Sequence, residues 1–236
     1  MTKEEGWVSS RYSPQDAQDS LRLLRKTSGD IEAASPAYQD WQYQRNPAGP
    51  AIATLAREAE TGRLVGQVAT IPIRVRLSGK VRVASLSLDP VIDPAYQGSG
   101  VLAGLLKDVC ALSAEEGIAL TYGFPNQASH LTFVNKAGFT NLGSVPLLVR
   151  PLNPERLAAK TTHSRVPAKT ASVARRVWRT PAPVPPQKAV PGLEIMEVDS
   201  FESSFVLLWD RIQHRFPVMV VRDPAYLNWR FAGVPG

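Results

Sequence analysis

The sequence predicts a protein of the α/β (α+β) class, built on a mixed sheet with helices on both faces. Apolar residues make up 44% of the 236-residue chain, which is enough to fill a core. Three runs of β-type residues follow one another between residues 51 and 92, separated by short turns. Helical patterns precede and follow these runs, and the apolar run at 118–124 is typical of a buried parallel strand.

The N-terminal part of the chain predicts one strand and two helices. The strand covers residues 7–12, and Ser13-Pro14 begins a helix that ends before Gly29. Ser35 and Pro36 are suited to cap and start a second helix over 35–47. The first helix carries its apolar residues at positions that share one face: Leu21, Leu23 and Leu24.

Three strands are then expected, over 51–58, 63–77 and 80–92, with turns at 59–62 and 78–80. A helix over 100–116 follows the third strand. Its apolar residues recur at helical spacing, and Gly117 ends it. These apolar residues are Leu102, Leu105, Leu106, Val109 and Leu112.

The next elements complete the predicted sheet. A strand is expected at 118–124, then a helix over 126–138 that Asn126 caps and Gly138 closes. A last strand or strand pair is expected within 139–152. The predicted order is therefore βααβββαβαβ.

The connection between the third of these strands and the helix at 100–116 carries the strongest indication of a site. Pro90 lies inside the strand and cannot donate a hydrogen bond, so the ladder should be interrupted there. Gly98 and Gly100 allow the backbone to approach a ligand, and the helix that follows presents free N–H groups to an anion. A tight connection without any ligand is the alternative. The stretch has neither the dinucleotide-binding nor the P-loop signature.

This connection resembles the central motif of the GNAT superfamily of acyl-CoA-dependent N-acetyltransferases. That motif is Arg or Gln, two residues, Gly, one residue, then Gly or Ala, and here it is Gln97-Gly98-Ser99-Gly100-Val101-Leu102. The approach to it, Ile92 to Gly100, and the Asn-led helix that ends in Gly138-Phe139 are similar to the family as well. The resemblance covers about 7–154 and is greatest to a bacterial branch associated with surface-polysaccharide synthesis.

The resemblance implies acetyl-CoA as cosubstrate and a small amine, such as an amino-sugar, as acceptor. It implies a sheet that is split between the strands flanking the acyl-CoA site. The pyrophosphate would bind the loop, and pantetheine would pair beside Val91 and Ile92, with Asn126 on its other edge. The loop residues so implicated are Gln97, Gly98, Ser99, Gly100, Val101 and Leu102.

For the chemistry, a base must accept the proton of the amine and an acid can protonate the thiolate. Asp89 is the preferred base, with Asp93 and His130 as alternatives, although Asp93 also suits a turn cap. Tyr122 is the candidate acid, and core packing is its alternative role. N–H groups near Val91 and Ile92 would stabilise the oxyanion.

Two departures from the family pattern bear on activity. Leu102 replaces the usual Gly or Ala, and the family's frequent helix tyrosine falls at Phe133 or Val134, neither of which can donate a proton. A non-catalytic acyl-CoA-binding or scaffold protein of the same fold is therefore the alternative function.

Composition limits the remaining classes. The single Cys110 cannot form an internal disulfide and is expected in the core, and the three histidines show no metal-ligand spacing, so no metal is expected. No apolar run has the length of a membrane span, and the N-terminus lacks a signal-peptide pattern. A cytoplasmic setting is expected, and the oligomeric state is left open.

The positive charge is concentrated in a connector over 154–192. This segment contains eight lysines or arginines against one acid, and seven prolines, so the rest of the chain is close to neutral. Nucleic-acid binding by the folded part is therefore not expected. The connector is either a solvated tether or, through a short basic helix around 168–179, a contact for an anionic partner.

The C-terminal residues resemble an earlier part of the chain. Residues 35–48 align without gaps with 223–236 at an offset of 188, and both Trp41 and Tyr38 have counterparts, Trp229 and Tyr226. The predicted division is thus a GNAT-like domain at 1–153, the connector, and an incomplete second repeat at 193–236. Chance similarity of two capped helices is the alternative. Such a repeat should pack against the first domain or stay mobile.

Overall fold

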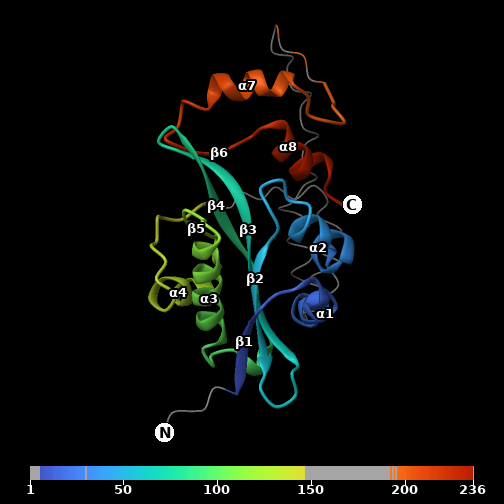
Figure 1. Cartoon of the computed structure of the whole chain (residues 1–236), viewed down its shortest axis with the longest axis vertical. Helices are drawn as coiled ribbons and strands as arrows, with labels where there is room; N and C mark the ends of the chain where they lie inside the picture. The colour runs from blue at the N-terminus through green and yellow to red at the C-terminus, as the bar shows by residue number, and fades with distance from the viewer. Residues whose placement is uncertain (1–5, 30, 147–191, 193, 195, 236) are drawn as a thin grey trace, which may run out of the picture. The chain divides into compact units, whose positions relative to one another are not determined.

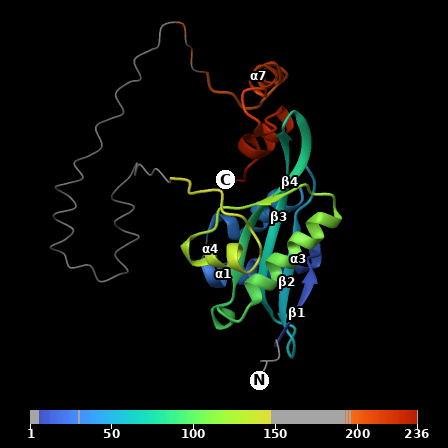
Figure 2. The same ribbon diagram turned by 90° about the vertical axis from the view of Figure 1, so that its left-hand side faces the viewer.

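The computed structural model describes residues 6–29, 31–146, 192, 194 and 196–235 (Figures 1 and 2). The chain divides into two compact units, one made of Met1–Asn141 with Val198–Gly236 and the other of Leu142–Glu197. All helices and strands of the described residues lie in the first unit, and the account below concerns that unit. The described residues contain no helix that is both long and apolar enough to cross a bilayer.

One sheet runs through this unit. Its strands lie in the order β1-β2-β3-β4-β5, and a further strand, β6, pairs with β3. Every pairing is antiparallel except that of β4 with β5, so the expected mixed sheet is confirmed. The strands are β1 (Trp7–Arg11), β2 (Ile52–Glu58), β3 (Leu64–Leu77), β4 (Lys80–Ile92), β5 (Thr121–Tyr122) and β6 (Val218–Val220).

Helices cover both faces of the sheet, as the sequence predicts. Figure 1 shows α1 (Ala17–Ser28) and α2 (Pro36–Tyr43) to one side, and α3 (Val101–Glu115) and α4 (Gln127–Asn135) to the other. Short 3₁₀ turns lie at Pro14–Asp16, Glu32–Ala34 and Pro94–Tyr96. The C-terminal helices are α7 (Ser204–Ile212) and α8 (Pro224–Leu227), and α8 continues as a π-helical turn, Asn228–Ala232.

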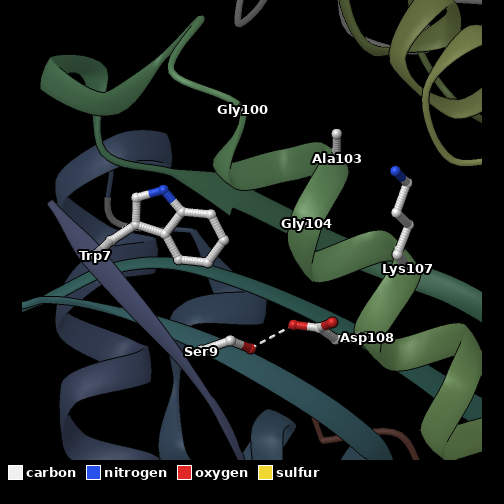
Figure 3. A pocket seen from close by; sticks show the side chains of 7 residues that line it. All are labelled: Trp7, Ser9, Gly100, Ala103, Gly104, Lys107 and Asp108. Atoms are coloured by element: carbon white, nitrogen blue, oxygen red, sulfur yellow. Dashed lines mark hydrogen bonds between the residues drawn. The ribbon is translucent and has the colours of Figure 1, made fainter. Parts of the chain in front are cut away.

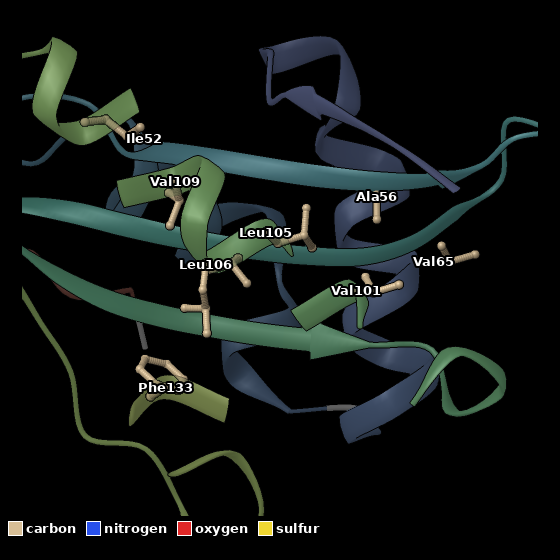
Figure 4. Close-up of a cluster of buried hydrophobic side chains, with 9 residues drawn as sticks. Ile52, Ala56, Val65, Val101, Leu105, Leu106, Val109 and Phe133 are labelled. Carbon is tan, nitrogen blue, oxygen red and sulfur yellow. The ribbon is translucent and has the colours of Figure 1, made fainter. Parts of the chain in front are cut away.

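The core under α3 fixes that helix on the sheet (Figure 4). Leu105, Leu106 and Val109 are fully buried, as their spacing predicts. They pack against strand residues such as Val65 and Val68. Cys110 lies half-buried beside this cluster, in agreement with its expected core position.

The other face is packed in the same way by α1. Leu23 and Leu24 are buried against Leu55, Leu64 and Val91. The caps that start the helices also match expectation. The Ser35 side chain accepts a hydrogen bond from the Tyr38 N–H at 3.2 Å, and the Asn126 side chain accepts one from the Ser129 N–H at 3.0 Å.

The strand predicted at 118–124 is much shorter and less buried than expected. Only two residues form β5, and Leu120 and Phe124 are 41% and 70% exposed. β5 ends at Tyr122, three residues before Pro125, which cannot donate to a ladder. Continuous hydrophobicity was a misleading signal, because β5 is an edge strand in the described part of the sheet.

The last strand expected within 139–152 is tested only in its first part. Residues 139–146 form neither strand nor helix, and 147–152 lie outside the described residues. Phe139 packs edge-on against Phe133 of α4, with ring centroids 5.0 Å apart, while Leu142 is 94% exposed. The apolar side chain of Phe139, which begins this segment, is therefore used to pack against α4 and not to pair with β5. The connector at 154–191 also lies outside the described residues.

The C-terminal segment packs against the first sheet, one of the two expected outcomes. It also contributes β6, a strand that the sequence did not predict. β6 pairs with Val75–Leu77 of β3. The same edge of β3 pairs with β2 nearer its start, over 64–70. The long β3 strand thus has two successive partners on one edge.

Two tryptophans join this segment to α2. The rings of Trp41 and Trp229 stack with centroids 4.9 Å apart and an interplanar angle of 18°. The Trp41 Nε1–H donates to the Trp229 carbonyl at 2.8 Å, and the Trp229 Nε1–H donates to the Trp41 carbonyl at 3.1 Å. Both side chains are buried, so each indole N–H satisfies its hydrogen-bonding potential through the other residue.

Replacing Trp229 by alanine should therefore release the C-terminal segment. We expect the free energy of unfolding to fall by about 3–5 kcal/mol, because a buried aromatic side chain and its hydrogen bond are lost together. Amide hydrogen exchange should speed up across α7, β6 and α8. Phe231→Ala is the matched control, since Phe231 is 64% exposed and its loss should change stability by no more than about 0.5 kcal/mol. Unchanged protection of β6 in Trp229→Ala would contradict this role.

Candidate functional site

The sheet opens between β4 and β5. These parallel strands pair only at Ser85 with Thr121 and at Leu86 with Tyr122. β5 then ends, whereas β4 continues to Ile92. In the described residues, the β4 edge after Leu86 therefore has no strand partner on this side, and the expected split in the sheet is confirmed.

A β-bulge lies in the same part of β4. The pairing of β3 with β4 shifts register, so that Asp89 and Pro90 together lie opposite Val68. Asp89 has a φ of +50°, an uncommon value for a residue other than glycine. The interruption expected at Pro90 is thus present, and the bulge changes the direction of the Asp89 side chain.

The glycine loop leads directly into α3. Gly98 and Gly100 have φ values of +81° and +92°, and Gly100 is the N-cap of α3. No atom lies within 4 Å of the Cβ position that a side chain would occupy at either glycine. These glycines are therefore required by backbone conformation rather than by close packing.

The loop presents backbone donors rather than side chains. In the described residues, the N–H groups of Gly98 and of 100–103 donate to no backbone carbonyl. The Ser99 hydroxyl donates to the Tyr96 carbonyl at 2.6 Å and is thereby engaged within the turn. Free N–H groups and the dipole of α3 together make this end of the helix suited to an anion.

A buried carboxylate holds the loop from behind. The Asp93 side chain is 3% exposed and accepts hydrogen bonds from Lys26 and Arg63, each at 2.7 Å. It also caps the turn by accepting from the Ala95 N–H at 3.1 Å. The hydrogen bond from Lys26, with those from Ala95 and Arg63, holds the pKa of Asp93 at about 2 despite burial. Its engagement favours the turn-capping role over that of a base.

A second set of contacts ties the loop to the β2–β3 turn. The Tyr96 hydroxyl donates to Glu58, and the Arg63 guanidinium lies 3.5 Å from the Glu58 carboxylate. Hydrogen bonds from Thr61, Tyr96 and Arg63 lower the pKa of Glu58 to about 2. Arg63 thus contacts both acidic residues and connects the two sets of interactions.

Asp89 lies on the face of the sheet that α2 covers. The Tyr43 hydroxyl donates to Asp89 Oδ2 at 3.2 Å. Burial raises the pKa of Asp89 above its usual value, and the Tyr43 hydrogen bond partly opposes that rise. Tyr43 is itself buried and packs edge-on against Tyr12, with ring centroids 5.5 Å apart. A half-buried carboxylate with a raised pKa is suited to accept a proton near neutral pH.

The other predicted residues surround the opening to different degrees. Tyr122 is half-buried on β5, and burial followed by the neighbouring Tyr226 raises its pKa. Asn126 uses its side-chain oxygen to cap α4, which leaves its amide group to donate. Val91 is buried toward α1, whereas Ile92 packs toward α3. His130 is half-buried on α4.

Several polar residues around Asp89 and Asp93 were not indicated by any sequence pattern. Tyr43 binds Asp89, and Lys26 and Arg63 bind Asp93, although all three belong to elements far away in the chain. In the described residues, Gln67 Oε1 and Ser87 Oγ are buried without a hydrogen-bond partner. Gln67 and Ser87 lie next to the bulge on β3 and β4. Only the tertiary contacts identify this group.

The comparison with protein families identifies the class. Residues 10–141 match the family described as an acetyltransferase (GNAT) domain. The match spans more than half of the chain and includes the glycine loop and the open strand edge. The protein therefore belongs to the GNAT acetyltransferase family. A comparison with curated protein sequences gives no match.

Solved structures of the same fold are distant in sequence. An aminoglycoside acetyltransferase from an uncultured soil metagenomic sample, in complex with trehalose, is 14% identical, with 64% of this chain and 99% of that chain covered and a TM-score of 0.50. A Trypanosoma brucei acetyltransferase is 21% identical, with 61% and 99% covered and a TM-score of 0.49. A predicted acetyltransferase from Clostridium acetobutylicum, solved with acetyl-CoA, is 13% identical, with 61% and 96% covered and a TM-score of 0.49.

The described residues hold no group of three or more His, Cys, Asp or Glu side chains that could bind a metal ion. The polar chemistry they offer at the opening is that of carboxylates, hydroxyls, an amide and backbone N–H groups. Such groups can bind an anion, position a carbonyl and accept a proton.

The Asp93 contacts predict a defined acid sensitivity. The pKa of Asp93 is about 2 in the folded protein, below the value of about 3.9 for an unfolded aspartate. Its stabilising effect is therefore present above about pH 4 and lost as the pH falls from about 4 to about 2. We expect Asp93→Asn to unfold at lower denaturant concentration than the parent at pH 7, and the difference to shrink at about pH 3.

Asp40→Asn is the control for this measurement, because it removes an ion pair with Arg45 that lies at the surface. Urea unfolding of the three proteins at both pH values gives the comparison. A difference between parent and Asp93→Asn that stays constant with pH would show that Asp93 contributes through shape and not through its charge.

Proposed function

We propose that this protein is an N-acetyltransferase that transfers an acetyl group from acetyl-CoA to the amine of a small acceptor. One observation carries the proposal: the open edge of β4 leads directly into a glycine loop in which the N–H groups of Gly98 and of 100–103 donate to no backbone carbonyl of the described residues. An extended ligand with an anionic group at one end and a reactive tail fits that combination. We place the activity in the cytoplasm, as the composition suggests.

The pyrophosphate of acetyl-CoA would bind the loop from Gln97 to Leu102 through backbone N–H groups. Leu102 departs from the usual small residue, but its side chain packs partly buried against the core under α3. Because that side chain is directed to the core, its bulk leaves the N–H groups accessible. Lys26 and Arg63 bind Asp93 behind the loop, and Arg63 also lies near Glu58, so these contacts hold the loop in place while their charges balance.

The pantetheine arm would extend along the free edge of β4. The Asp93 N–H donates to the Val65 carbonyl, so it faces β3. Backbone groups alternate along a strand, so the N–H of Ile92 faces the opening and that of Val91 faces β3. Ile92 is therefore the better donor for the thioester oxygen, and the Asn126 amide can donate from α4.

The chemical step is direct transfer. The amine nitrogen attacks the thioester carbonyl, the C–N bond forms, and Asp89 accepts the ammonium proton. The C–S bond then breaks, and Tyr122 donates a proton to the departing thiolate. The helix position at which the family often has a tyrosine cannot do this, because Phe133 is buried against Phe139. That packing favours, as a second candidate function, an acyl-CoA-binding protein without turnover.

The acceptor class is the finer part of the proposal. We favour an amino-sugar, on the resemblance of the sequence to a bacterial branch associated with polysaccharide synthesis. Acetyl-CoA turnover measured against a panel of amines, with amino-sugars and simple alkylamines as separate arms, tests it. If acetyl-CoA binds but none of the amines in the panel causes thiol release, the non-catalytic alternative is favoured.

We infer also that the C-terminal segment is a structural counterpart of the α1–α2 pair. Asp223 accepts from the Tyr226 N–H at 3.0 Å, as Ser35 accepts from the Tyr38 N–H at the position 188 residues earlier. The reciprocal hydrogen bonds of the two tryptophans join residues with the same separation of 188. Contacts that exchange roles between equivalent residues are the mark of a two-fold relation. Hydrogen exchange on Trp41→Ala and Trp229→Ala tests it: both should expose the C-terminal helices, and release by only one would contradict equivalence.

The loop is tested by a matched pair of substitutions at Gly100. No atom lies within 4 Å of its Cβ position, so a side chain can be accommodated although the φ of +92° is unfavourable. Gly100→Glu and Gly100→Gln share bulk and backbone strain, and only the former adds negative charge beside the pyrophosphate. We expect Gly100→Glu to bind acetyl-CoA about 10- to 100-fold more weakly than Gly100→Gln.

Calorimetry measures both affinities, and Ser99→Ala serves as the control that should bind like the parent. If Gly100→Glu folds and binds as tightly as the parent, the loop is only a turn and the proposal loses its main support.

The base is tested through the pH dependence of kcat/KM. Asp89→Asn should lower kcat by about 10²- to 10⁴-fold, because the carboxylate that accepts the proton is lost. Burial raises the pKa of Asp89, so the acidic limb of the parent should lie above the usual value of about 3.9. Tyr43→Phe removes a hydrogen bond that stabilises the carboxylate, so this limb should move to higher pH. Tyr12→Phe, which keeps the Tyr43 hydroxyl, should leave it in place. An acidic limb that is the same in Tyr43→Phe and the parent would exclude Asp89 as the titrating base.

A further inference from the structure

A groove with no assigned role lies beside the start of α3, on the side that faces β1 (Figure 3). Its volume is about 480 Å³. Trp7 and Ser9 of β1 form one wall, and Gly100, Gly104 and Lys107 follow one another along α3. The groove begins at the last glycine of the loop and runs away from the opening in the sheet.

The indole of Trp7 shapes this groove because α3 has no side chain at Gly104. A Cβ at that position would lie 2.6 Å from the Trp7 ring, which is closer than atoms can approach. Glycine therefore lets the large aromatic ring of β1 lie against the helix. The result is a half-buried indole beside an open space, next to a helix surface made of small residues.

Of the two charged side chains that line the groove, Asp108 has a hydrogen-bond partner, whereas Lys107 has no carboxylate partner among the described residues. Asp108 accepts a hydrogen bond from the Ser9 hydroxyl, so one oxygen of its carboxylate is occupied. Lys107 is exposed and, within the described residues, has no carboxylate within 4 Å. In Figure 3 the Lys107 ammonium and the Trp7 ring lie on opposite sides of Gly104. The groove thus offers an aromatic ring, an unpaired cation and a carboxylate oxygen.

We propose that this groove binds the adenosine 3′-phosphate end of acetyl-CoA, with Trp7 against the adenine and Lys107 at the 3′-phosphate. The inference rests on the proposed function, since it requires the pyrophosphate at the neighbouring loop. Lys107 lies seven residues beyond Gly100, or about 10 Å along the helix axis. A ribose and its phosphate can cover that distance from a pyrophosphate at Gly100. Rings stack on aromatic faces, and ammonium groups pair with phosphates.

The carboxylate of Asp108 favours a ligand with an adenine base over a simple polyanion. Its second oxygen can accept from the exocyclic amino group of adenine, whereas it would repel a phosphate placed deep in the groove. The 3′-phosphate therefore belongs at the outer end, at Lys107, and the base belongs at Trp7.

The experiment compares two donors, acetyl-CoA and its 3′-dephospho form, by calorimetry on the full chain. The parent should bind the dephospho form about 10-fold more weakly, a difference typical of one lost ion pair with a phosphate. Lys107→Ala should bind acetyl-CoA about 10-fold more weakly than the parent and should bind both donors equally. Lys80→Ala is the matched control, because it removes an exposed lysine at the distant β3–β4 turn and should leave the parent's preference intact.

A second variant tests the aromatic wall. Trp7→Phe should weaken both donors by the same factor, because stacking on adenine does not depend on the 3′-phosphate. Thermal unfolding of the variant shows whether the fold is kept. If Lys107→Ala keeps the parent's preference for the 3′-phosphate, the inference is overturned while the proposed function stands. If the parent binds neither donor, the proposed function fails and this inference fails with it.

Discussion

The unequal pairing of β4 is the constraint on which the rest of the site depends. On one edge β4 pairs with β3 along almost its whole length, and on the other its parallel pairing ends at Leu86. A strand with a free edge stays in place only if its faces are packed. The buried apolar side chains under α1 and under α3 supply that packing from both sides. The opening therefore exists without loss of the sheet, and its free backbone groups are fixed in direction.

The loop at the end of β4 needs a comparable constraint, because free N–H groups bind an anion well only if they are held in position. Asp93 provides it from inside the protein. One buried carboxylate joins Lys26 of α1, Arg63 at the start of β3 and the turn itself. The positive charges of Lys26 and Arg63 balance the negative charges of Asp93 and Glu58. Anion binding at the loop therefore depends on the backbone N–H groups that these contacts hold in position.

The length of β3 links the two ends of the chain. Its first half pairs with β2 and its last three residues pair with β6 on the same edge. This leaves the C-terminal segment beside α2, where Trp41 and Trp229 bury each other's indole groups. The segment also brings Tyr226 close enough to Tyr122 to influence its pKa. The C-terminal residues therefore contribute to the surroundings of a proposed catalytic side chain.

The sequence by itself determined the local elements of this protein. Apolar spacing predicted α1 and α3, Ser35 and Asn126 predicted two helix caps, and Pro90 predicted the interruption of β4, because each depends on residues that are neighbours in the chain. The sequence misjudged the length of β5, because hydrophobicity alone does not show whether a partner strand is available. Only the tertiary structure decided which distant groups meet: Tyr43 at Asp89, Lys26 at Asp93, and β6 on β3. Those contacts depend on which elements pack against one another, and the spacing of apolar residues within one element does not reveal its partner.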